Sequence, residues 1–176
     1  MNNAEFAKSL QEKRRSLIRG QMESNPDFAI GKKVTFYIVL VLSLLMAMEI
    51  VLQLVPYIIY SFPIVMKELF RNIWSLAFGV LLLIAAYNNG YKACIFLNLA
   101  GGLLSLLVLY AQGVFSYFSS GNIFFSILTA YTTAVRVITV ITMIFILANK
   151  LCKTYIGTIA DIRKEIQNDM RNQQIK

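Results

Sequence analysis

The side chains in this sequence that are best able to take part in chemistry are two charged residues inside long apolar runs. Arg136 lies at the midpoint of Ile123–Asn149, and Glu49 lies within Val34–Val55. A charge at the centre of a membrane-spanning helix costs at least about 2.5–3.5 kcal/mol on insertion scales, so it needs a partner or a wet cavity. Both charges therefore mark candidate functional positions.

The two charges are expected at matching depths. Glu49 is 15 residues in from Val34, and Arg136 is 13 residues in from Asn149. At 1.5 Å per helical residue, both should lie about 20 Å from the same edge of a membrane. We predict that they meet inside a helix bundle. The candidate hydrogen-bonding neighbours are Gln53, Ser105 and Gln112.

Four threonines share one helical face with Arg136. Thr129, Thr132, Thr133 and Thr139 stand at offsets of −7, −4, −3 and +3 from it. Ion pairs of this kind either fix the register of the helices or serve a gate, a proton- or ion-coupled step, or a ligand contact. The opposite face should meet lipid and consists of Ile127, Ala134, Ile138, Ile141 and Phe145.

Two other apolar runs carry stripes of small and polar residues, which favour close helix packing in lipid. The stronger stripe consists of Cys94, Asn98, Gly101, Gly102, Ser105 and Gln112. The weaker stripe consists of Ser75, Gly79 and Ala86.

The composition is typical of an integral membrane protein. Of 176 residues, 57% are hydrophobic and 15% are charged, against about 25% charged in soluble domains. Most charges lie before residue 34 or after residue 149. The net charge of +8 then reflects membrane topology, and no folded nucleic-acid-reading domain accompanies it. We expect no nucleic-acid partner.

The apolar runs predict an all-α, integral membrane four-helix bundle. The expected spans are 34–55, 72–87, 91–115 and 123–149, of which 72–87 is only just long enough. Pro56–Arg71 should be a loop or a short helix in the outer headgroup layer, because prolines interrupt it and aromatic residues line it. Domain 34–149 is thus the predicted membrane domain.

The Lys and Arg distribution predicts that both termini are cytoplasmic. With an even number of spans, fourteen basic residues fall in cytoplasmic segments and only Lys67 and Arg71 fall in outer loops. This asymmetry follows the positive-inside rule. The abundance of Ile, Asn and Lys suggests a bacterial plasma membrane.

The terminal segments, 1–33 and 150–176, are expected to be amphipathic and cytosolic. Asn3–Arg19 predicts a basic helix that either lies on the anionic cytoplasmic leaflet or forms a solvated tail. The last spanning helix should continue into the cytosol. Its apolar seam would pack against the N-terminal helix, against a partner chain or in self-association, and consists of Tyr155, Ile159, Ile162, Ile166 and Met170.

The residues that catalysis usually requires are scarce. There is no histidine, and the two cysteines, Cys94 and Cys152, stand far apart, so neither a cofactor nor a metal site is expected. Two functions remain open. One is a non-enzymatic partner of another membrane protein, either an accessory or assembly subunit or an immunity-type protein. The other is a homo-oligomeric channel or transporter whose Thr129/Thr133/Arg136/Thr139 face lines a polar path.

Overall fold

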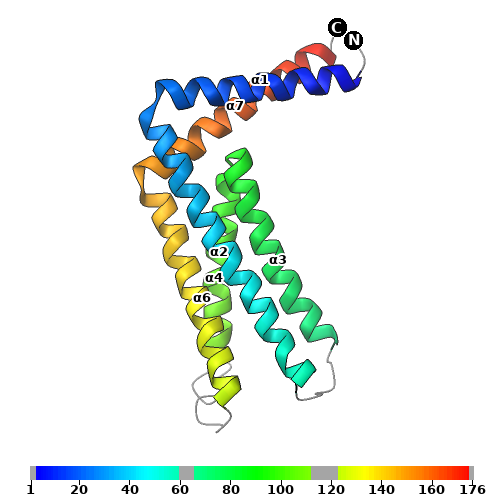
Figure 1. Cartoon of the computed structure of the whole chain (residues 1–176), viewed down its shortest axis with the longest axis vertical. Helices are drawn as coiled ribbons and strands as arrows, with labels where there is room; N and C mark the ends of the chain where they lie inside the picture. The colour runs from blue at the N-terminus through cyan, green and yellow to red at the C-terminus, as the bar shows by residue number, and fades with distance from the viewer. Residues whose placement is uncertain (1–2, 60–65, 112–122, 175–176) are drawn as a thin grey trace.

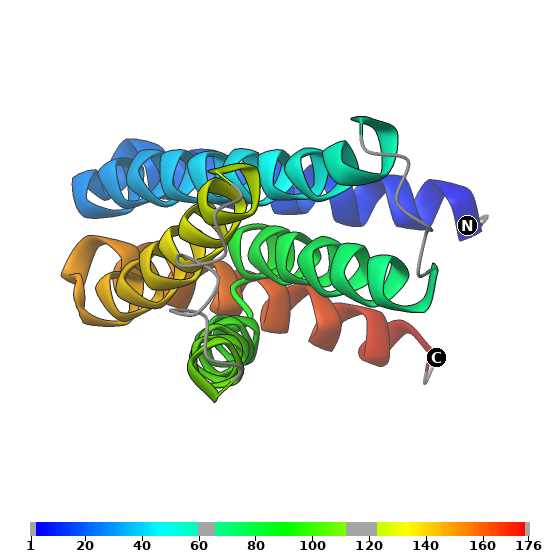
Figure 2. The ribbon, with the colours of Figure 1, turned by 90° about the horizontal axis from the view of Figure 1, so that it is seen from below.

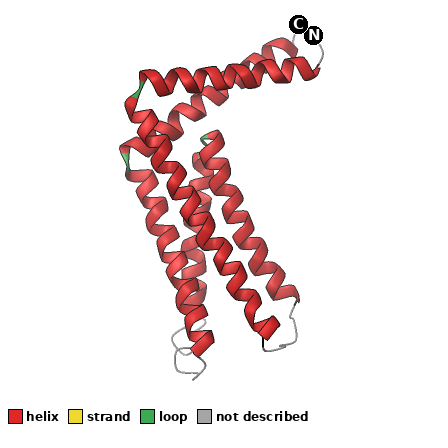
Figure 3. Ribbon diagram, viewed as in Figure 1, coloured by secondary structure: helices red, strands yellow, loops and turns green. Residues whose placement is uncertain are grey.

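The computed structural model describes residues 3–59, 66–111 and 123–174, and every regular element within these ranges is a helix (Figure 3). The helices are α1 (Asn3–Ser24), α2 (Pro26–Ile59), α3 (Met66–Asn89), α4 (Lys92–Ala111), α6 (Ile123–Ala148) and α7 (Lys150–Gln174).

Four of these helices form a bundle, and the other two lie across one end of it. Helices α2, α3, α4 and α6 run side by side, while α1 and α7 turn away from the bundle axis together (Figures 1 and 2). We call the α1–α7 pair the arm. Because α1 begins and α7 ends at the tip of the arm, the two chain ends lie on the same side of the bundle (Figure 1).

Three helices are long and apolar enough to cross a membrane. They cover Pro26–Val55, Lys92–Ala111 and Ser126–Ala148. The predicted span 72–87 falls on α3, whose apolar part is the shorter Ile73–Asn89. Its 17 residues reach about 25 Å at 1.5 Å per residue, slightly less than the hydrocarbon thickness of about 30 Å.

Helix α2 is longer than the predicted first span at both ends. It begins at Pro26, where Asn25 caps it by accepting a hydrogen bond from the Phe28 N–H at 3.2 Å, and proline suits the first helical position. It also passes Pro56 and ends at Ile59. Pro56 lies in the last turn, where its missing N–H costs only one bond near the helix end. The segment Pro56–Arg71, expected to be a separate loop or short helix, therefore belongs at its two ends to α2 and α3, since α3 begins at Met66.

The last apolar helix does not continue unbroken into the final segment, as the sequence suggested, but ends at Ala148, and α7 begins at Lys150. The Asn149 side-chain oxygen accepts hydrogen bonds from the N–H groups of Leu151 (2.9 Å) and Cys152 (3.2 Å). An Asn in this position is a strong N-cap, so it starts a new helix in a new direction. Helix α7 thereby turns across the end of the bundle (Figure 1).

The predicted apolar seam of α7 fastens the arm to the bundle. Tyr155, Ile159 and Ile162 are buried, and the Tyr155 hydroxyl donates a hydrogen bond to the Tyr87 carbonyl at 3.0 Å. Burial raises the pKa of the Tyr155 phenol, so it remains a donor at neutral pH. The seam thus packs within the chain along its first half.

The turn between α3 and α4 lies directly on α7. Gly90 has a φ of 64°, and a Cβ there would come within 2.5 Å of the Ile156 carbonyl oxygen. Only glycine adopts this backbone conformation without strain and allows this close approach.

Candidate functional site

The polar centre of the bundle is an ion pair between Glu49 and Arg136. The Arg136 Nη2 atom lies 3.0 Å from Glu49 Oε1, as their matching depths predicted. The Glu49 side chain is completely buried, and that of Arg136 is 14% exposed. Gln53 Nε2 donates to the same oxygen at 3.2 Å. Two donors therefore converge on one carboxylate oxygen.

Helical spacing places Glu49 on the inner face of α2. Leu42 and Met46 are buried on the same stripe, seven and three residues earlier, which is the spacing that aligns side chains along one side of a helix. On α6, Val135 and Thr139 flank Arg136 and are also buried. The pair thus joins the inward faces of two helices.

The threonines of α6 bond mainly to their own helix. Thr139 Oγ1 donates to the Val135 carbonyl, and Thr133 Oγ1 donates to the Thr129 carbonyl, both at 2.8 Å. Thr129 and Thr132 are half-buried. These back-bonds satisfy the hydroxyl donors locally. All five residues of the predicted lipid face are exposed: Ile127, Ala134, Ile138, Ile141 and Phe145.

Tyr131 is a further member of the site that the sequence reasoning missed. Its hydroxyl donates to the Leu45 carbonyl on α2 at 3.0 Å, one helical turn from Glu49. A phenol inside hydrocarbon needs a hydrogen-bond partner. The signal was available, because Tyr131 lies well inside an apolar run and not at its end, where aromatic belts occur.

The predicted packing stripes of α3 and α4 meet at Asn98. Its Nδ2 atom donates to the Gly79 carbonyl at 3.2 Å, and both residues are buried. One turn further along α4, a Cβ added to Gly102 would come within 2.9 Å of Val140 Cγ2. Gly79 and Gly102 therefore lie at close helix contacts, with α4 and α6 respectively.

Several predicted residues lie elsewhere. Gly101 is exposed, and a Cβ there would meet nothing within 4 Å. Ser75 is exposed on α3. Both residues therefore lie on the outer surface of the described bundle. Ser105 is half-buried and, in the described chain, makes no hydrogen bond to Glu49 or Arg136. Gln112 lies outside the described residues.

The ion pair brings two opposite charges together and joins α2 to α6. The described residues contain no cluster of three or more His, Cys, Asp or Glu side chains that could hold a metal ion. Comparisons of this chain with protein-family models, with curated proteins and with solved structures found no match.

Proposed function

We propose that this chain is a four-span plasma-membrane protein of bacterial type that acts without catalysis, by presenting its arm to a partner protein. In this proposal both termini are cytoplasmic, and the protein serves as an accessory or assembly subunit or as an immunity-type protein. The observation that carries the proposal is the arm, which extends sideways from the end of the bundle and is built from both terminal helices (Figures 1 and 2).

The bundle supports this proposal because its central charged groups bond to one another. Glu49, Arg136 and Gln53 bond to one another, and Asn98 bonds to a neighbouring helix. The outer surface is mainly Leu, Ile, Val and Phe, which suits lipid. A helix bundle of this kind is better suited to hold the arm at a membrane than to catalyse a reaction.

The same packing weighs against the channel alternative. A homo-oligomeric pore lined by Thr129, Thr133, Arg136 and Thr139 requires that face to meet water. Thr139 is 2% exposed, and the Arg136 side chain is directed at Glu49. An inward, bonded face favours a packed bundle.

Four spans are proposed in place of three because the two chain ends lie at the same end of the bundle (Figure 1). Chain ends on one side require an even number of crossings. Helix α3 packs between α2 and α4 along the bundle, so it shares their membrane layer.

Photo-cross-linking in intact cells tests the partner proposal. A photoreactive amino acid is placed at exposed arm positions, Arg15 or Lys164, and at the exposed bundle position Ile141 as a control. We expect the arm positions to give one discrete cross-linked protein in addition to the chain itself. Cross-links only to lipid or to a second copy of the chain would contradict the proposal.

A further inference from the structure

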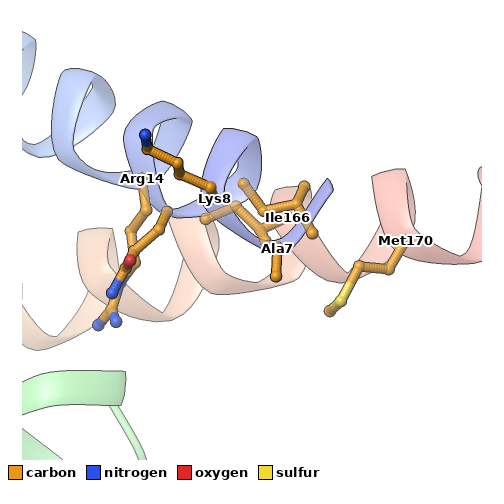
Figure 4. A pocket seen from close by; sticks show the side chains of 7 residues that line it. Ala7, Lys8, Arg14, Ile166 and Met170 are labelled. Carbon is orange, nitrogen blue, oxygen red and sulfur yellow. The ribbon is translucent and has the colours of Figure 1, made fainter. Parts of the chain in front are cut away.

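The arm contains an open groove between its two helices, near its tip. The groove has a volume of about 680 Å³, within the range of small-ligand sites. Its apolar wall comes from Ala7, Leu10, Ile166 and Met170, and Arg14 closes its inner end. Figure 4 shows side chains of α1 and α7 around the groove, with Arg14 directed toward the ends of α3 and α4.

The groove opens on the side of the arm that faces the bundle end. Arg14 lines the groove and also donates a hydrogen bond through Nη2 to the Asn88 carbonyl at the end of α3. Ile18, one turn further along α1, packs against the hydrophobic core. This flank of α1 therefore passes from the groove directly onto the bundle. If the bundle spans a membrane, the groove faces the adjacent leaflet surface.

Several carboxylates of the arm lie on other sides of its helices than Arg14 and Arg163. Glu5 and Glu23 each stand nine residues from Arg14, and nine residues are two and a half helical turns, which places them on the opposite side of α1. On α7, Asp161 and Glu165 each stand two residues from Arg163, so they too lie on another side of the helix. Arg163 stacks on Tyr91 at the bundle end, 3.9 Å from the ring centroid.

The carboxylates on the far flank of the arm are engaged there. Lys13 bonds to Glu165 at 2.9 Å and to Asp169 at 2.7 Å. Lys13 and Asp169 line a separate hollow between the two helices, while Arg14 lines the groove. The lining of the groove, in contrast, includes two basic residues, Lys8 and Arg14, and no carboxylate.

We infer that this groove binds the headgroup of an anionic phospholipid from the leaflet beside the bundle. Arg14 holds the phosphate, and Ala7, Leu10, Ile166 and Met170 contact the glycerol and the first carbons of the acyl chains. A guanidinium carries five N–H donors, and the Asn88 bond uses one of its nitrogens. Basic residues beside an apolar surface are the combination that anionic leaflets attract. The inference rests on the membrane placement proposed above, but not on a protein partner.

Native mass spectrometry of the full-length protein tests the inference. The protein is held in non-ionic detergent with equal amounts of phosphatidylglycerol and phosphatidylcholine. We expect the wild type to retain phosphatidylglycerol preferentially. Arg14→Gln should weaken that retention about fivefold, because one basic residue near an anionic surface contributes about 1 kcal/mol and 1.4 kcal/mol is a factor of ten. Arg171→Gln, which removes the same charge at the arm tip outside the groove, should change it little.

A second pair of variants tests whether a negative charge in the apolar wall of the groove prevents lipid binding. Met170→Glu places a negative charge in the groove and should abolish the preference for phosphatidylglycerol. Gln167→Glu adds the same charge on α7 outside the groove and should keep it. A zero-length cross-link between Lys13 and Glu165 or Asp169, mapped by peptide mass, shows in each variant that the arm is still closed.

Three results would overturn the inference. The first is equal retention of the two lipids by the wild type. The second is an equal loss in Arg14→Gln and Arg171→Gln when the arm is closed in both. The third is complete displacement of the lipid by inorganic phosphate, which would make the groove a general anion site. Because the measurement uses the purified protein, its failure leaves the cross-linking test of a partner standing, and the reverse also holds.

Discussion

At the scale of single residues, the Glu49–Arg136 pair shows how a helix bundle accommodates buried charges. Arg136 offsets part of the cost of burying the Glu49 carboxylate, and Gln53 adds a second donor to the same carboxylate oxygen. Replacing such a pair by apolar residues is often neutral, whereas removing one partner leaves a buried charge uncompensated. The two single variants should therefore be less stable than the double variant.

We expect Glu49→Gln and Arg136→Gln each to destabilise the bundle by about 3–5 kcal/mol. The double variant should lose less, and exchanging the two residues should partly restore stability. Thermal unfolding in detergent, followed by circular dichroism, measures the effect. Thr133→Val is the control, because its hydroxyl bonds only to its own helix. Normal stability of both single variants would show that the ion pair does not contribute to the stability of the bundle.

Two adjacent glycines on α4 offer a matched comparison. A Cβ at Gly102 would lie 2.9 Å from Val140 Cγ2, whereas a Cβ at Gly101 would meet nothing within 4 Å. Gly102→Ala should destabilise the protein by about 1–3 kcal/mol through overpacking, because the branched Val140 side chain has little rotamer freedom. Gly101→Ala should be neutral or stabilising by up to about 1 kcal/mol.

Unfolding measurements on these two variants test the comparison. The double variant Gly102→Ala/Val140→Ala should recover part of the lost stability, because it removes the Val140 methyl group that the added Cβ would contact. If Gly101→Ala costs as much as Gly102→Ala, then α4 packs through its outer side in the assembled protein.

These residues also show what a sequence can and cannot predict. The depth of Glu49 and Arg136 followed from a constant helical rise, so their meeting was predictable from numbering alone. Gly101 and Gly102 differ by 100° around the helix, and both fall within one broad polar stripe. Distinguishing them requires the position of α6, which only the folded chain supplies. The inward face of α6 was predictable because it is wide and carries a charge.

At the scale of elements, helix boundaries were the least predictable feature. The polar start of α2, over residues 26–33, is helical because Asn25 caps it, and a hydropathy pattern does not register caps. Asn149 acts in the same way between α6 and α7. This single capping side chain thereby starts α7 in a new direction, across the end of the bundle.

The contact between α1 and α7 should depend on pH and salt. Hydrogen bonds to Asp169 and Glu165 raise the pKa of Lys13 above its ordinary value of 10.5. A raised pKa means that the contact stabilises the arm below about pH 10.5 and is lost as the pH rises through the higher value of the folded protein. Because these groups are exposed, salt also screens the contact.

Hydrogen exchange of the α1 amides, corrected for the intrinsic rate at each pH, measures this closing of the arm. Lys13→Met should remove the pH step above pH 10, and Lys8→Met should keep it. An unchanged step in Lys13→Met would assign the pH dependence to other groups.

At the scale of the whole molecule, the proposed topology makes a direct prediction. In cells that produce single-cysteine variants of a chain lacking Cys94 and Cys152, Ile123→Cys should react with a membrane-impermeant maleimide from outside. Ser9→Cys should react only after permeabilisation. These positions stand at the outer end of α6 and on the arm, respectively.

Labelling of both positions from outside would contradict the cytoplasmic placement of the arm. The labelling of Ile123→Cys alone would support four spans, because it places the far end of the bundle opposite both terminal helices.

The closure of the arm also has a consequence for the order of events during synthesis. Lys13 meets Asp169, which lies 156 residues later in the chain, and the entire bundle is encoded between them. Contacts separated so widely form late in folding. While the ribosome makes the intervening helices, α1 has no α7 beside its apolar stripe of Phe6 and Leu10. The arm can therefore close only after α7 has been synthesised. A chain interrupted before α7 would still expose this stripe to quality-control proteases.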